Sequence, residues 1–268
     1  MHPAVIIIPA RYRSTRFPGK PLASIAGIPM IRRVFEQCAQ ARCASRILVA
    51  TDDERIAETV RAFGGDVVMT PTGIATGTER VAHAAAATDC RPDEVIVNVQ
   101  GDEPLIEPAV IDAAAACIVG TDADIGTCAS PLQDAEAFRD PMVVKVVLAR
   151  DGHALYFSRA PIPHAFHPPD HGGGGPVQAL RHIGIYAFMR RCLERFAALP
   201  PSPLEKLEGL EQLRALEAGM RIRVAVVLSR SIAVDTPEDI PLVEARIASE
   251  TGTSGTPGHF PSDRYASA

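Results

Sequence analysis

The sequence predicts an α/β fold, a doubly wound and mostly parallel sheet with helices on both faces. The first observation is an apolar run without alternation at Val5–Ile8, typical of a strand buried on both faces. The second is that such runs alternate with helical-period segments through about the first half of the chain, which favours right-handed crossovers between parallel strands. The third is size: 268 residues, 47% of them hydrophobic, supply a sizeable core.

The strands and helices of this first part follow in order. The helix near residue 30 carries apolar residues at helical spacing. The helix that follows it is ended by the pair Gly64-Gly65. A capping box at Thr51–Glu54 opens that second helix, which runs to about Phe63. The predicted strands lie at 5–8, 46–50, 66–69, 94–99 and 124–130, and the other helices at 30–38, 78–87 and 108–119.

After Pro131 the pattern becomes antiparallel. Met142–Ala149 and Ala154–Phe157 are predicted strands joined by a turn at Asp151-Gly152. A mobile loop rich in glycine and proline follows at 164–176, and then a strand at 181–189. We expect this excursion, about 142–189, to lend a sheet edge to a second copy of the chain in a homodimer.

The last part of the domain returns to alternating elements. A capping box at Ser202–Glu205 opens one helix with leucines along a single face, so Glu205 is interpreted as structural. A strand at 222–228 and a Thr-capped helix ending near Ile247 complete a single domain, 1–248. The polar, glycine-rich stretch 249–268 is predicted to be a disordered tail.

Composition excludes several classes of protein. The formal net charge of −5 argues against a general nucleic-acid binder. The sequence has no run of 18 apolar residues that would span a membrane, and its first residues do not resemble a signal peptide. None of the six cysteines forms a C-x-x-C pair, so buried reduced thiols and a cytoplasmic location are expected.

A basic loop follows the first strand. Its cations stand among small hydroxyl residues and loop formers, in the stretch ARYRSTRFPGKPL that contains Arg11, Ser14, Thr15, Arg16 and Lys20. Ligands of open α/β sheets bind at the carboxyl ends of the strands, where these groups suit a polyanion such as a nucleoside triphosphate. The alternative is a solvated basic loop. The loop matches neither the G-x-x-x-x-G-K-[ST] nor the G-x-G-x-x-G phosphate motif.

Two aspartates are predicted at the same edge of the sheet. Asp102 follows the strand 94–99, and Asp235 stands just before the final helix. Mg²⁺ prefers oxygen ligands and usually takes one or two protein carboxylates, so this pair is the candidate metal site. Each aspartate alone could be an ordinary surface or helix-flanking residue. Asp52 and Asp53 also resemble a metal pair, but helix capping explains them equally well.

The loop resembles that of the sugar-activating nucleotidyltransferases, specifically the 3-deoxy-manno-octulosonate (Kdo) cytidylyltransferase family. Further motifs carry the same resemblance in the same order across nearly the whole chain. They are TGTER at 76–80, NVQGDEP at 98–104, ALYFSR at 154–159, RHIGIY at 181–186, PSPLE at 201–205, LEQLR at 210–214 and VDTPED at 234–239. The glycine-rich insert at 171–175 and the tail depart from the family pattern without touching a motif.

The resemblance implies a nucleotide-diphospho-sugar transferase-like fold, a homodimer, and transfer of CMP from CTP to Kdo for lipopolysaccharide biosynthesis. It implies that the triphosphate and nucleoside lie against Arg11, Ser14, Thr15, Arg16, Lys20, Arg80 and Gln100. It implies Mg²⁺ at Asp102 and Asp235, which with Lys20 and Arg11 form the catalytic set. It places Arg159, His182, Tyr186, Glu211 and Gln212 around the sugar acid.

Other interpretations stay open. The acceptor could be sialic acid or an amino-substituted Kdo, and a module that only binds nucleotide could share the fold. His182 could be an in-sheet histidine bonded to backbone, and Glu211 a solvated helical residue. Because no cysteine or serine lies in a nucleophile motif, we expect direct attack on CTP without a covalent enzyme intermediate.

Overall fold

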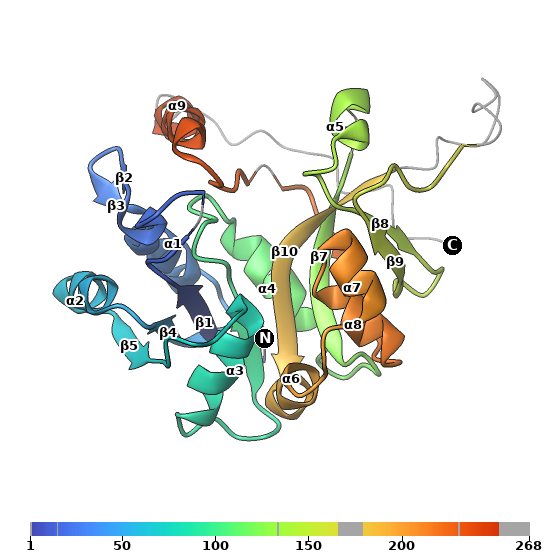
Figure 1. Cartoon of the computed structure of the whole chain (residues 1–268), viewed down its shortest axis with the longest axis horizontal. Helices are drawn as coiled ribbons and strands as arrows, with labels where there is room; N and C mark the ends of the chain where they lie inside the picture. Colours follow the sequence, from blue (N-terminus) through green and yellow to red (C-terminus); the bar gives the residue numbers. More distant parts are fainter. Residues whose placement is uncertain (1, 15, 133, 166–178, 230, 252–268) are drawn as a thin grey trace.

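The computed structural model describes residues 2–14, 16–132, 134–165, 179–229 and 231–251. These residues form one nine-stranded sheet with the main order β11-β7-β10-β6-β1-β4-β5 and a two-stranded ribbon, β2-β3 (Figure 1). The predicted doubly wound, mostly parallel α/β sheet is thereby confirmed. Most of the predicted tail, from residue 252 on, and most of the glycine-rich loop, including 171–175, lie outside the described residues.

The amino-terminal half of the sheet is parallel, as predicted. Its strands are β1 (Ala4–Ala10), β4 (Ala44–Thr51), β5 (Asp66–Met69) and β6 (Val95–Asn98). Strand β1 lies in the middle of this half, in parallel register with β4 on one side and β6 on the other. All seven residues of β1 are buried, because helices cover both faces of the sheet here.

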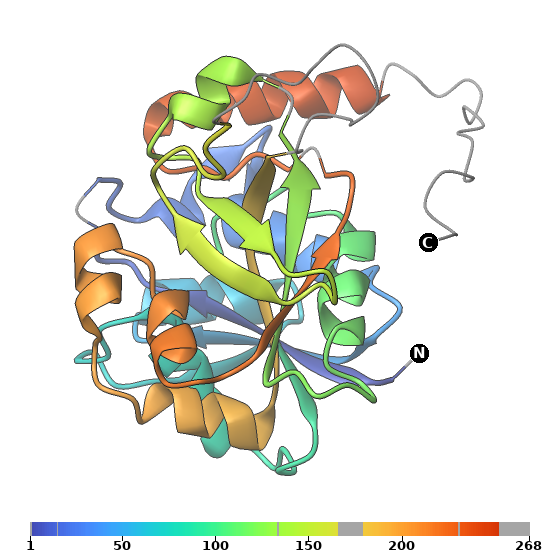
Figure 2. The same cartoon turned by 90° about the vertical axis from the view of Figure 1, so that its right-hand side faces the viewer.

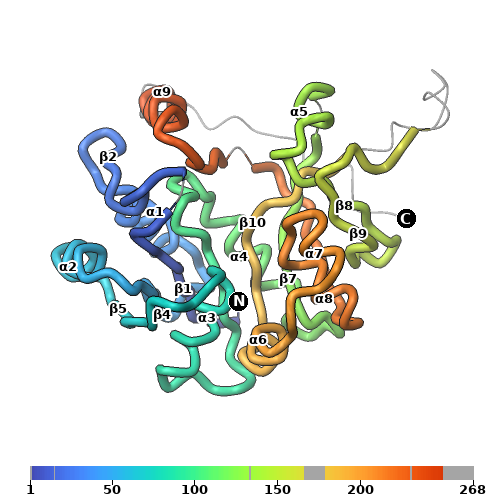
Figure 3. Tube along the Cα trace, viewed as in Figure 1, coloured from blue at the N-terminus to red at the C-terminus, as the bar shows by residue number. Residues whose placement is uncertain are grey.

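The other half of the sheet contains an antiparallel strand. It is built from β7 (Ile125–Pro131), β10 (Leu180–Met189) and β11 (Ile222–Val226). Strand β10 runs antiparallel to both β6 and β7, and so joins the two halves (Figure 3). The predicted strand 181–189 therefore belongs to the centre of the main sheet, and only its first residues pair with the excursion.

The excursion itself is a hairpin at the side of the molecule. Strands β8 (Lys145–Leu148) and β9 (Ala154–Ser158) pair antiparallel, as predicted, and the hairpin lies toward the viewer in Figure 2. A short helix, α5 (Ala135–Arg139), precedes it. Strand β9 has β8 as its only strand partner among the described residues, and directly before it His153 forms an isolated antiparallel bridge with Arg223 of β11.

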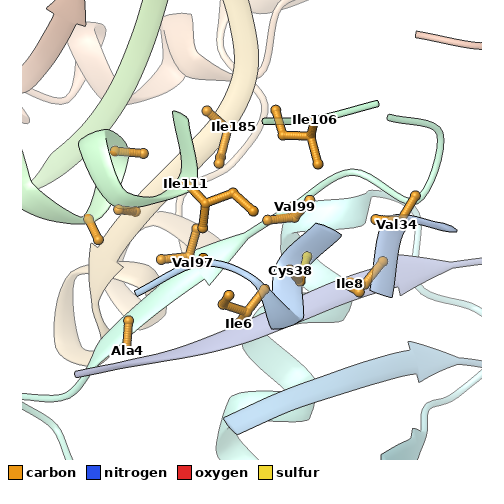
Figure 4. Close-up of a cluster of buried hydrophobic side chains, with 14 of the residues drawn as sticks. Ala4, Ile6, Ile8, Val34, Cys38, Val97, Val99, Ile106, Ile111 and Ile185 are labelled. Atoms are coloured by element: carbon orange, nitrogen blue, oxygen red, sulfur yellow. The ribbon is translucent and has the colours of Figure 1, made fainter. Parts of the chain in front are cut away.

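Two apolar layers pack against the two faces of the sheet. On one face, β1 and β6 meet α1 (Met30–Ala39), α2 (Glu54–Ala62) and α4 (Pro108–Ala116), as Figure 4 shows for side chains including Ile6, Val34 and Ile111. On the other face lie α3 (Gly77–Ala86), α6 (Arg190–Ala197) and α8 (Gln212–Glu217). This double burial explains the uninterrupted apolar runs in the sequence.

The predicted leucine-bearing helix from Ser202 onward is wrong as a single element. The capping box is present, but α7 (Pro203–Glu208) ends at Gly209, whose φ of 64° is left-handed, and α8 starts afresh. Leu207 is consequently 83% exposed, whereas Leu213 is fully buried. Helix α6 was not predicted. Glu205 is structural, as predicted, and forms a buried ion pair with Arg214 at 2.5 Å.

Two capping predictions need adjustment. Asp53, rather than Thr51, caps α2 by accepting a hydrogen bond from the amide of Arg55. Thr51 belongs to β4. Thr236 caps a 3-10 turn (Pro237–Asp239) that leads into α9 (Ile240–Thr251), so this helix includes the first residues assigned to the tail.

The described residues contain no helix with the length and apolar character needed to cross a bilayer. The six cysteines are free thiols, and five of them are buried, as predicted. Burial raises the pKa of the Cys117 thiol, which makes it a small apolar core residue rather than a reactive one.

Candidate active site

A cleft lies at the carboxyl ends of the parallel strands. It is bordered by the basic loop after β1, the start of α3, the loop after β6, the α7–α8 turn and the segment after β11. The sequence-predicted site residues that line it are Arg11, Ser14, Arg16, Lys20, Arg80, Gln100, Asp102, Glu211 and Asp235. The structure therefore brings together most of the predicted nucleotide and metal residues, and one of the sugar residues.

The basic loop is closed by its own contacts. The amide of Gly19 donates to the carbonyl of Tyr12 at 2.9 Å, and the hydroxyl of Ser14 accepts from the amide of Phe17 at 3.3 Å. Gly19 has φ = 74° and lies against the Tyr12 ring, so a side chain there would be strained and crowded. Arg11 reaches across the cleft to the carbonyl of Ala75 at 3.5 Å. Thr15 lies outside the described residues.

Lys20 joins the basic loop to both metal-candidate segments. Its ammonium lies 2.6 Å from a carboxylate oxygen of Asp102 and donates to the carbonyl of Val234 at 2.9 Å. The amide of Val234 in turn donates to the carbonyl of Asp102 at 2.9 Å. These three contacts fix the segment before Asp235 against the loop after β6. Asp102 and Asp235, which are 133 positions apart in the sequence, therefore line the same cleft.

Asp235 has a separate set of contacts. Its carboxylate lies 3.1 Å from the guanidinium of Arg16, and its own amide donates to the carboxylate of Asp239 at 2.8 Å. Asp239 also accepts from the amide of Thr236 at 2.8 Å, and these backbone bonds lower the pKa of its carboxyl. The capping carboxylate of Asp239 thus holds the backbone from which Asp235 extends.

The two aspartates fit a magnesium site. Each uses one oxygen for a cation of the basic loop, and within the described stretches neither Asp102 Oδ1 nor Asp235 Oδ2 has a hydrogen-bond partner. Both side chains are partly exposed to the cleft, at 31% and 41%. Two hard oxygen donors beside the basic loop match the preference of Mg²⁺ for few protein ligands. No cluster of three or more candidate ligand side chains occurs among the described residues.

Arg80 and Gln100 line the cleft in different ways. The Arg80 side chain is buried and pairs with Asp52 at 3.1 Å and with the hydroxyl of Thr70, so it anchors α3 to the ends of β4 and β5. This contact gives Asp52 a structural partner instead of a metal. Gln100 is half-buried with its amide toward Gly77. A Cβ on Gly101 would lie 2.9 Å from the carbonyl of Pro9, so this glycine permits close backbone packing rather than ligand approach.

Glu211 connects the cleft to a small neighbouring pocket. It lines both spaces, and the second also contains Tyr186, Gln212 and Thr78. Burial raises the pKa of Glu211, and the Thr78 hydroxyl opposes that rise. Gln212 is buried, at 5% exposure. Three predicted sugar residues therefore lie together beside the cleft, so Glu211 is not a solvated helical residue.

His182 lies further along β10. Its ring packs on Phe157 and Tyr186, with centroid distances of 5.0 and 5.5 Å, and its Nε2 is 2.9 Å from the hydroxyl of Thr127. The partner is thus a side chain and not backbone. Burial lowers the pKa of His182 to about 3, so the imidazole is neutral near pH 7. His182 lines a second cavity with Glu103 and does not line the main cleft.

Arg159 also lies outside the main cleft lining. Its guanidinium donates to backbone carbonyls of Glu208 at 2.7 Å and Pro141 at 2.8 Å. The side chain is half-buried beside the turn that precedes Glu211. The Arg159 guanidinium therefore binds the backbone of Glu208, three residues before the predicted sugar residue Glu211. It does not line the cleft that contains Asp102.

Sequence reasoning missed a set of contacts between the segment after β6, which carries Asp102, and the segment after β11, which carries Asp235. Ser231 donates to Glu103, and Ser229 donates to Glu107 at 2.7 Å. Burial raises the pKa of Glu103 to about 7. Glu103 stands in the NVQGDEP motif, but nothing in the pattern shows which distant hydroxyl meets it. Asn98, also in that motif, has a fully buried amide without a hydrogen-bond partner among the described residues.

Comparison with protein families and curated proteins gives a consistent result. A family model described as cytidylyltransferase matches residues 5–222. A 3-deoxy-manno-octulosonate cytidylyltransferase from Syntrophotalea carbinolica is 54% identical over 245 residues, which cover 90% of this chain and 97% of that protein. The enzyme of the same name from Myxococcus xanthus is 49% identical over 249 residues, covering 92% and 98%.

Solved structures agree. CMP:2-keto-3-deoxy-manno-octonic acid synthetase complexed with CTP is 39% identical, covers 92% of this chain and 99% of its own, and superposes with a TM-score of 0.83. A 4-diphosphocytidyl-2C-methyl-D-erythritol synthase is only 14% identical with a TM-score of 0.60, and shows that the fold is shared more widely.

Proposed function

Because this chain belongs to the 3-deoxy-manno-octulosonate cytidylyltransferase family, we propose that it transfers CMP from CTP to the anomeric hydroxyl of Kdo, releasing pyrophosphate. The observation that carries the proposal is the cleft that joins the basic loop to Asp102 and Asp235. We further propose that the product is used for lipopolysaccharide biosynthesis, in keeping with the name of the relatives.

The basic loop supplies the charge that a triphosphate needs. Arg11, Arg16 and Lys20 line one wall of the cleft, and Ser14 lies between them. Arg16 and Lys20 lie against the two carboxylates. A bound triphosphate offers them oxygen acceptors of higher charge, and Gln100 lines the same cleft, where its amide can read the nucleoside.

Asp102 and Asp235 would hold the magnesium ion through their unpartnered oxygens. When bound, such an ion offsets phosphate charge and lowers the pKa of a coordinated hydroxyl. Asp102, Asp235, Lys20 and Arg11 are then the catalytic set. Lys20 keeps the loop after β6 against the segment before Asp235, so the two carboxylates stay on one cleft.

The sugar hydroxyl attacks the α-phosphorus directly, in line with the departing pyrophosphate. A nucleotidyl-lysine on Lys20 is disfavoured because its ammonium is ion-paired with Asp102 and has no lone pair to attack phosphorus. Incubation of the protein with α-labelled CTP in the absence of sugar should leave the chain unlabelled. A stable adduct on Lys20 would refute direct transfer.

The decisive assay is pyrophosphate release from CTP and Mg²⁺ with a panel of sugar acids. We expect release with Kdo, and none when CTP, Mg²⁺ or Kdo is omitted. Sialic acid and amino-substituted Kdo belong in the panel because the same cleft charge would suit them. Turnover with either of these but not with Kdo would overturn the proposed acceptor.

We also propose a cytoplasmic homodimer. The lack of a second strand partner for β9 among the described residues and the 62% exposed Leu155 on that strand support association through the β8–β9 hairpin. Five buried free thiols suit a reducing compartment. Light scattering should give about twice the 28.5 kDa chain mass at micromolar concentration, and the monomer mass would contradict the dimer.

A further inference from the structure

Lys145, on strand β8, is a fully buried cation, and among the described residues its ammonium forms no ion pair with a carboxylate. Its ammonium donates instead to three backbone carbonyls, those of Asp140 at 2.8 Å, Val143 at 2.5 Å and Arg159 at 2.6 Å. All three N–H groups are therefore used. A buried charge is tolerated only when it is fully hydrogen-bonded, so this arrangement has a structural purpose.

Arg159, whose carbonyl binds Lys145, is also bound through its amide by Glu208, at the end of α7. One carboxylate oxygen accepts from the amide of Arg159 at 2.9 Å, and the other accepts from the hydroxyl of Ser158 at 2.7 Å. The backbone of Arg159 is thus held between opposite charges, with its N–H on a carboxylate and its C=O on an ammonium. These charge-assisted bonds are stronger than neutral ones.

The guanidinium of Arg159 donates to three backbone carbonyls, one from each of its nitrogens. Nε donates to the carbonyl of Glu208 at 2.7 Å, Nη1 to Pro141 at 2.8 Å and Nη2 to Gly209 at 3.4 Å. A guanidinium has five N–H groups, so one on each terminal nitrogen has no acceptor among the described residues. Two parallel N–H groups match the two oxygens of a carboxylate.

We propose that Lys145 and Glu208 are positioning residues that clamp the Arg159 backbone, so that its two remaining N–H groups are held ready for the carboxylate of the acidic sugar. This inference rests on the proposed function, which assigns the sugar acid to Arg159. A guanidinium fixed in advance loses less conformational entropy on binding than a free one. Glu208 also precedes the turn that carries Glu211, so the same contact ties two sugar residues together.

The clamp can be tested without any activity. In Glu208→Ala, hydrogen exchange at the Arg159 amide should speed up by roughly tenfold or more, because its acceptor is gone. Asp112→Ala is the matched control, since Asp112 accepts from the Cys43 amide at 2.9 Å far from the site. It should speed exchange at residue 43 and leave residue 159 unchanged. An unchanged Arg159 amide in Glu208→Ala would overturn the clamp, whatever the enzyme's activity.

Steady-state kinetics test the consequence for the sugar. Glu208→Ala should raise KM for Kdo about tenfold while KM for CTP stays within about twofold, as expected for loss of a charge-assisted bond. Glu208→Gln keeps an acceptor oxygen and should recover most of the loss. Asp112→Ala should change neither KM. Equal changes in both KM values, or no change, would contradict a positioning role.

A double-mutant cycle tests whether the effect passes through Arg159. In an Arg159→Ala background, Glu208→Ala should have no further effect on KM for Kdo. Lys145→Met should behave like Glu208→Ala, and Glu208→Ala alone decides the outcome if Lys145→Met does not fold. An undiminished effect in the Arg159→Ala background would overturn the proposal. Failure of the wild-type protein to use Kdo would instead reject the proposed function, while the exchange measurement still judges the clamp.

Discussion

The proposed nucleotide side and the proposed sugar side of this molecule are built in different ways. On the nucleotide side, Arg16 and Lys20 lie directly on the cleft and pair with its carboxylates. On the sugar side, Arg159 is held by backbone carbonyls, and His182 by a threonine hydroxyl and aromatic rings. The first side presents cations that are already paired with carboxylates, so a bound polyanion would compete with those carboxylates. The second offers groups that are already fixed.

The sheet topology accounts for this difference. The parallel strands β1 and β6 deliver loops to one edge, so the cations of the basic loop and Asp102 meet there directly. The antiparallel β10 instead presents side chains along its length, where His182 and Tyr186 lie on one face. The proposed nucleotide residues thus lie mainly on loops, and the proposed sugar residues on a strand and a helix turn.

The largest expected effect lies on the nucleotide side. Asp102→Asn and Asp235→Asn should each lower kcat by on the order of a hundredfold or more while CTP still binds, because they remove charge that stabilises the transition state. Initial rates and CTP binding measured on the same preparations check this. Asp53→Asn is the control, since Asp53 caps α2 outside the cleft lining and asparagine caps equally well. Normal turnover in either cleft variant would contradict the assigned roles.

A smaller and more selective effect is expected on the sugar side. Arg159→Ala should raise KM for Kdo by roughly ten- to a hundredfold, the equivalent of about 1.5–3 kcal/mol for a hydrogen bond to a charged group. KM for CTP should stay within about twofold, because Arg159 does not line the main cleft. Kinetics with each substrate varied in turn separate the two values. A parallel rise in both would show that the two sides are not independent.

Much of this arrangement is predictable from local sequence. The runs around Val5–Ile8 and 94–99 are buried strands because both faces of the sheet are covered, and the motifs at their ends meet because parallel strands end together. Ser14, Lys20 and Asp102 can therefore be assigned to one edge of the sheet from the sequence alone. Even the broken helix had a signal, since Gly209 supplies the left-handed residue that ends α7.

Other features depend on contacts between distant segments. Strand β10 lies between β6 and β7 because it pairs with both. Its alternating sequence pattern suits an edge strand equally well, so the pattern alone does not indicate these partners. The same holds for Lys145, which the sequence places in an ordinary strand although its ammonium is caged by carbonyls. The commitment of Arg80 to Asp52 is likewise tertiary, so its role toward the nucleoside stays a prediction.

The smallest expected effect concerns His182 and uses pH to test how rigid the sugar side is. Burial lowers the pKa of His182 in the folded protein to about 3 from an ordinary 6.5, so the unfolded chain binds its proton first as the pH falls. Stability from the neutral ring is therefore complete above pH 6.5 and declines as the pH falls toward 3. The decline is at most about 1.4 kcal/mol per pH unit.

Denaturant unfolding at about pH 7 and about pH 5.5 measures this decline. The wild-type protein should lose about 1 kcal/mol more than His182→Gln between these two conditions, since glutamine carries no titrating proton. Other groups, such as the paired Glu205, titrate alike in both proteins and cancel in the difference. Equal losses would mean that His182 accepts its proton without unfolding, so that the environment of the ring against Phe157 adapts to the charge. The sugar side would then be as adaptable as the nucleotide side, and the contrast between them would fail.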